Sequence, residues 1–130
     1  MSELPPGPDR IEALALAARD SLPDPFAGLA REVRLIVTDW PEENLLDELE
    51  IESAYELTGL YDGVPLTERS VEAPSQPSAI TLFRRPILDE WIERGDIALP
   101  DLVAHVLVHE LAHHFGWSDE DIARIDRWWE

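Results

Sequence analysis

Apolar residues at helical spacing predict three helices along the chain. In each of three segments they recur every three or four residues, the repeat of one face of an α-helix. These segments are 9–20, 86–93 and 100–115. Asp9 is expected to cap the first helix. Gly95 and Gly116 are expected to end the second and third, because glycine readily adopts the left-handed conformation of a helix C-cap.

Alternating apolar and polar residues predict short strands between the helices. Strands are expected over 32–38 and 79–84, a strand with a turn over 57–67, a short acidic helix over 42–50 and a loop over 72–78. Ser118 is expected to cap a last helix over 119–128. Two or three strands among four or five helices predict an α+β domain. We expect residues 1–8 to be a flexible leader and 9–130 to be one domain.

The composition excludes several kinds of protein. The 130 residues include 28 acidic residues and 10 basic ones, all arginine, and the formal net charge is −18. Such a charge repels nucleic acid, and no polybasic patch is present to hold a membrane surface. No apolar stretch is long enough to span a bilayer, so we expect a cytoplasmic protein. Because there is no cysteine, a metal ion would need histidine and carboxylate ligands.

The strongest predicted helix carries a candidate zinc site, His109-Glu110-Leu111-Ala112-His113. At about 100° per residue, the directions of His109 and His113 differ by about 40°, so one face of the helix presents both imidazoles. Two imidazoles placed in this way can hold one Zn²⁺. Glu110 lies beside them, where it can take a proton from a metal-bound water. The pattern therefore predicts a metal-dependent hydrolase.

A third ligand is expected shortly after the helix. Gly116 can turn the backbone back toward the metal, and Asp119 follows three residues later. Two histidines alone leave zinc under-coordinated, which favours Asp119 as a ligand. An acidic residue in the first turn of a helix is also expected from the helix dipole alone.

The extended motif His109-Glu110-x-x-His113-x-x-Gly116-x-x-Asp119 resembles that of the zincin metallopeptidases. The wider chain, from Phe26 to Ile122, is similar to the small bacterial zincin-like family, also called minimal zincins. Its segments 59–61, 63–69 and 80–88 look like recurring segments of that family. The resemblance implies a short mixed sheet packed on the active-site helix, one zinc per chain, and hydrolysis of peptide or protein substrates. It also implies that His109, His113 and Asp119 are ligands and that Glu110 is the general base.

A non-catalytic zinc-binding module that binds a basic partner protein is the alternative. Larger zincins carry a methionine turn after the third ligand, whereas the one methionine here is Met1. The charge of −18 would steer a basic partner toward the protein.

Several other residues keep more than one interpretation. Arg84, Arg85 and Tyr61 could contact a substrate or serve only structure. We expect His105 and His114 to be surface groups or supports for the ligands. The apolar residues of the motif helix are expected to form core: Leu102, Val103, Val106, Leu107, Leu111 and Phe115.

Overall fold

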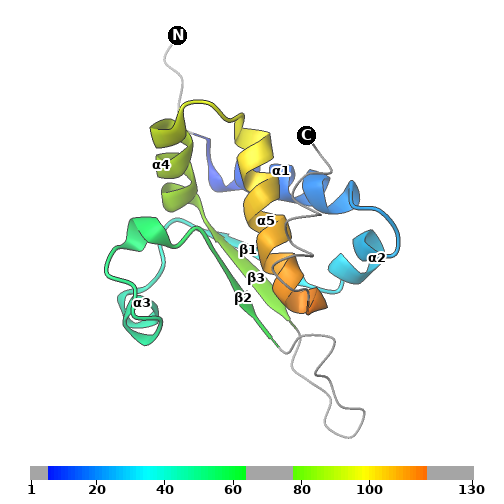
Figure 1. The fold of residues 1–130 in the computed structure, drawn as a ribbon, viewed down its shortest axis with the longest axis horizontal. Helices are drawn as coiled ribbons and strands as arrows, with labels where there is room; N and C mark the ends of the chain where they lie inside the picture. The colour runs from blue at the N-terminus through cyan, green and yellow to red at the C-terminus, as the bar shows by residue number, and fades with distance from the viewer. Residues whose placement is uncertain (1–5, 64–77, 117–130) are drawn as a thin grey trace, which may run out of the picture.

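The computed structural model describes residues 6–63 and 78–116, which form a small mixed sheet and five α-helices (Figure 1). In chain order the elements are α1 (Pro8–Asp20), α2 (Phe26–Ala30), β1 (Arg34–Thr38), α3 (Glu43–Glu48), the 3₁₀ turn η1 (Ala54–Glu56), β2 (Gly59–Asp62), β3 (Ala79–Phe83), α4 (Arg84–Arg94) and α5 (Leu99–Phe115). The α+β prediction is confirmed. None of the described helices is long and apolar enough to cross a membrane.

The sheet has β3 at its centre and is mixed. β1 pairs with β3 in parallel, and β2 pairs with it in antiparallel orientation. The parallel pair aligns Leu35 with Ile80, while the antiparallel pair aligns Tyr61 with Ile80. Because side chains alternate between the two faces of a strand, these three side chains share one face of the sheet.

That face packs against α1 and α5, and the core lies between them. Ile80 and Leu82 of the central strand are almost completely buried, as is Ile11 of α1. α5 packs against β2 and β3, and α1 packs against β1 and α5. All six apolar residues of the motif helix that were predicted to form core are buried. Burial of one side of α5 leaves its other side open for the polar residues of the motif.

The predicted helix ends are confirmed at two glycines. Gly95 and Gly116 are the C-caps of α4 and α5, with φ of 69° and 73°, in the left-handed region. The start of α1 differs from the prediction, because the helix begins at Pro8 and its N-cap is Gly7. Proline suits this first position, since the first helical N–H has no partner within the helix. Asp9 therefore lies in the first turn of α1.

Two short elements were not predicted, α2 and η1. Both are shorter than two turns, so neither contains enough residues to show a periodic pattern. The predicted helix over 119–128 lies outside the described residues, as does the predicted loop over 72–78 except for Ser78.

Candidate metal centre

The two motif histidines lie on the exposed side of α5, with Glu110 half-buried beside them. The ring centroids of His109 and His113 are 5.7 Å apart. One ligand atom from each of His109, Glu110 and His113 lies within 4.8 Å of the other two. Nitrogen and carboxylate oxygen atoms at this spacing are a donor set that fits a divalent transition metal such as zinc. The three residues of the motif therefore lie close enough together for two of them to hold a metal ion while the third acts beside it.

Strand β2 approaches α5 very closely at this point, because Gly59 has no side chain. A Cβ atom at Gly59 would lie 3.0 Å from Cγ1 of Val106 and 3.2 Å from Cγ of Glu110. Contacts this short leave room for a hydrogen atom and not for a methyl group. The glycine thus allows the backbone of the edge strand to lie directly against the candidate general base.

The surroundings of Glu110 have opposing effects on the pKa of its carboxyl group. Burial raises the pKa of Glu110 above its usual value, because desolvation disfavours the charged form. Electrostatic interaction with His113 and His109, and a hydrogen bond donated by the backbone N–H of Tyr61, lower the pKa, and burial is the larger effect. A raised pKa makes the ionised carboxylate a stronger base.

Tyr61 is held by a buried hydrogen-bond network behind the site. Its hydroxyl oxygen lies 2.8 Å from Nδ1 of His114 and 3.0 Å from Oγ of Ser78. His114 is completely buried and Ser78 nearly so. The surface interpretation of His114 is therefore wrong, and the other interpretation, a support for the site, agrees with its contacts. The same tyrosine bonds the network through its side chain and Glu110 through its backbone N–H.

A cavity of about 190 Å³ opens beside this candidate metal centre, lined by Thr58, Glu90, His105, Val106, His109 and Glu110. His105 is half-buried, and its ring centroid is 6.4 Å from that of His109. Sequence reasoning did not single out Glu90 or Thr58. They reach this cavity from α4 and from the residue before β2, so no local motif could have linked them to the histidines.

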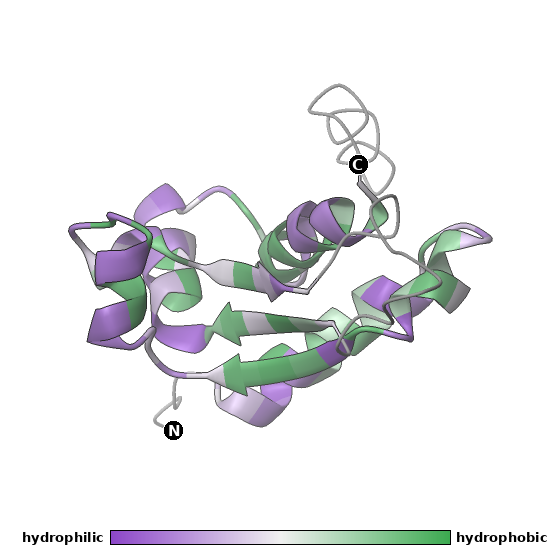
Figure 2. Ribbon diagram, turned by 90° about the horizontal axis from the view of Figure 1, so that it is seen from below, coloured by the Kyte–Doolittle hydropathy of each residue, from purple (hydrophilic) through white to green (hydrophobic). Residues whose placement is uncertain are grey.

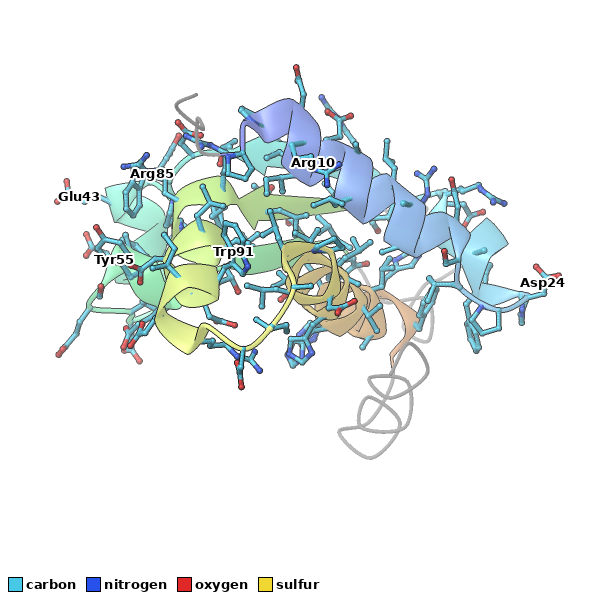
Figure 3. The ribbon with its side chains drawn as sticks, turned by 90° about the horizontal axis from the view of Figure 1, so that it is seen from above. Arg10, Asp24, Glu43, Tyr55, Arg85 and Trp91 are labelled. Carbon is cyan, nitrogen blue, oxygen red and sulfur yellow. The ribbon has the colours of Figure 1, made fainter. Side chains whose placement is uncertain are left out.

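The two consecutive arginines lie elsewhere and make other contacts. Nε of Arg84 donates to Oδ1 of Asp39 at 2.7 Å, and its Nη1 donates to the carbonyl of Pro6 at 2.9 Å. The Arg84 guanidinium lowers the pKa of Asp39 through this bond. The guanidinium carbon of Arg85 lies 5.9 Å from the ring centroid of Trp40. Figure 3 shows Arg85 at the same end of the molecule as Tyr55 and Glu43. These contacts favour the structural interpretation of both arginines.

The comparisons with known proteins agree with this geometry. A sequence model described as zincin-like metallopeptidase matches residues 30–129, more than three quarters of the chain. No curated protein matches the chain. The matched range includes Asp119, the predicted third ligand, which lies outside the described residues.

Proposed function

Because the chain belongs to the zincin-like metallopeptidase family, we propose that it is a zinc-dependent peptidase whose centre is built on α5. The observation that carries the proposal is the convergence of His109, Glu110 and His113 within 4.8 Å on the exposed side of one helix. His109 and His113 would hold the metal. Asp119 is the third ligand that we propose, from its place in the motif. Zinc bound here supplies a Lewis acid that polarises a carbonyl group and lowers the pKa of water.

Glu110 is the group that moves the proton in this proposal. Its carboxylate accepts a proton from the attacking water and passes it to the amine that leaves the cleaved peptide bond. In the metal-free protein burial raises the pKa of this carboxyl group, and a hydrogen bond from the backbone N–H of Tyr61 orients it. The proton acceptor is thus fixed in place before the substrate arrives, which lowers the entropic part of the barrier.

Strand β2 supports a peptide as the substrate. Among the described residues β2 pairs only with β3, so it is an edge strand, and it lies directly against Glu110 at Gly59. Edge strands bind extended peptides through main-chain hydrogen bonds. A peptide aligned along β2 would pass beside the two histidines.

A matched pair of proteins tests the proposal. Wild-type protein and Glu110→Gln, both loaded with zinc, are incubated with a diverse peptide library, and new termini are identified by mass spectrometry. Loss of the general base is expected to reduce cleavage by about 10²- to 10⁴-fold. Zinc content should be unchanged, since the histidines remain. Equal cleavage by both proteins, or none by either, would reject the peptidase and leave the zinc-binding module.

A further inference from the structure

A second hollow lies on the side of the sheet that α1 and α5 do not cover. It has a volume of about 430 Å³ and is lined by Thr38, Trp40, Glu42, Asn44, Leu45, Glu48, Leu60, Thr81 and Phe83. We call it the far-face groove. Figure 2 views the sheet from this side, with the three strands next to one another. Its volume falls within the range of about 300–1,000 Å³ that is usual for ligand sites.

Strand alternation separates the far-face groove from the metal centre. Leu60 and Thr81 are aligned across β2 and β3, and each lies between residues that point toward α5. They therefore point to the opposite face of the sheet. Leu45 of α3 adds an apolar wall beside them. A ligand in this groove would touch neither His109 nor His113.

Trp40 forms an ordered aromatic rim of the groove. It is 39% exposed, although it is a large hydrophobic side chain. Tyr55 packs edge-to-face on it with ring centroids 5.1 Å apart, and the Arg85 guanidinium lies over its ring. These two contacts hold the indole in place while part of it stays open to solvent. Partly exposed tryptophans with fixed orientation are typical anchors of protein interfaces.

Apart from Arg85 at the rim, where it lies over Trp40, the charges at the far-face groove have one sign. Glu42 and Glu48 are both exposed, and none of the lining residues is basic. The whole chain carries a net charge of −18, which adds a long-range field of the same sign. Charge complementarity therefore requires a cationic ligand, and the apolar floor requires that the ligand also has apolar side chains.

We propose that the far-face groove docks a segment of a partner protein in which apolar side chains alternate with lysine or arginine. An apolar side chain would pack on Leu60 and Phe83 beside Trp40, and a neighbouring basic side chain would reach Glu42 or Glu48. This proposal locates the basic partner on a defined surface. It does not depend on catalysis, because the groove and the metal centre lie on opposite faces of the sheet.

The test uses a fluorescein-labelled decapeptide of alternating leucine and lysine, with a leucine–glutamate decapeptide as its counterpart. Affinity is measured by fluorescence anisotropy. The lysine peptide is expected to bind wild type, and Glu42→Gln/Glu48→Gln is expected to weaken it by about fivefold or more. Glu12→Gln/Glu32→Gln removes the same net charge at exposed sites outside the groove, so it should change the affinity by less than about twofold.

Two further variants and one competitor complete the design. Trp40→Ala should weaken binding like the groove double variant, and Trp40→Phe should restore part of the affinity. Equal losses in both charge variants would show general attraction to an acidic protein and would overturn the proposal. A small amine such as 4-phenylbutylamine that displaces the peptide at the same concentration would also overturn it, since the groove would then be a small-molecule site.

Discussion

At Glu110, a partly buried carboxyl group lies between two imidazoles and the edge of a sheet. Without metal, its folded-state pKa is raised, mainly by desolvation. The unfolded chain has the ordinary pKa, so it releases the proton first as the pH increases. Between the two pKa values the folded protein binds more protons than the unfolded one. Its stability therefore decreases across that interval and stays lowered above it.

Because ionisation of Glu110 lowers the stability of the metal-free protein, the effect of Glu110→Gln can be predicted. Glutamine keeps the size of the side chain and can still accept the bond from Tyr61, but it carries no charge. The variant should be more stable than wild type at pH 7.5, and the difference should shrink at pH 4. Urea unfolding in the presence of EDTA at both values measures it. If the variant and the wild type differed in stability by the same amount at pH 7.5 and at pH 4, the burial of Glu110 would be contradicted.

Tyr61 is the residue that links the buried network to Glu110. Tyr61→Phe removes the hydroxyl group between Ser78 and His114 and leaves both buried. A loss of stability of about 1–3 kcal/mol is expected, because two buried polar groups each lose a hydrogen bond. If the protein is an active peptidase, kcat should fall while KM changes little, because Glu110 would be less well oriented for proton transfer.

Tyr55→Phe is the matched control for this variant. Tyr55 is exposed, and its substitution should change stability by less than about 0.5 kcal/mol. Thermal and urea unfolding of both variants, with zinc content measured in parallel, provide the comparison. Equal stability of the Tyr61 and Tyr55 variants would show that the buried network contributes nothing.

At the scale of elements, the contact between β2 and α5 depends on one glycine. In Gly59→Ala the new methyl group would meet Val106 and the base of the Glu110 side chain. Overpacking of this kind typically lowers stability by about 1–3 kcal/mol. The displacement should also lower catalytic activity, because Glu110 would move relative to the histidines.

Gly28→Ala, in contrast to Gly59→Ala, is expected to increase stability. Gly28 lies within α2, and a Cβ atom there would meet nothing within 4 Å. Alanine favours helix over glycine by about 1 kcal/mol, so this variant should be slightly more stable. Chemical unfolding of both variants compares them. A Gly59 variant as stable as wild type would mean that the strand and helix are not in close contact.

Local sequence patterns predicted the helices and strands well, but they predicted few of the contacts between these elements. Periodicity identified α1, α4 and α5, alternation identified β1 and β3, and Gly95 and Gly116 marked two helix ends. The motif also predicted which side chains of α5 would converge, because one turn of helix fixes their spacing. The role of Gly59 and the burial of His114 could not be predicted in this way, since both depend on contacts between distant segments.

At the scale of the whole molecule, the small sheet separates two surfaces. One face packs on the helix that carries His109, Glu110 and His113, and the other borders the far-face groove. With this arrangement, a partner bound in the far-face groove would leave the candidate metal centre on the other face uncovered. Peptide binding in the far-face groove and zinc binding on α5 can therefore be tested independently, and the proposed function depends on zinc binding.

Zinc stoichiometry by native mass spectrometry tests the metal centre most directly. The wild-type protein should carry one zinc per chain, Glu110→Gln should keep it, and Asp119→Ala should bind it more weakly. His109→Ala/His113→Ala should lose it. A wild type that stays metal-free in zinc-containing buffer, or a double histidine variant that keeps a full zinc, would contradict the account of α5 as the metal-binding helix.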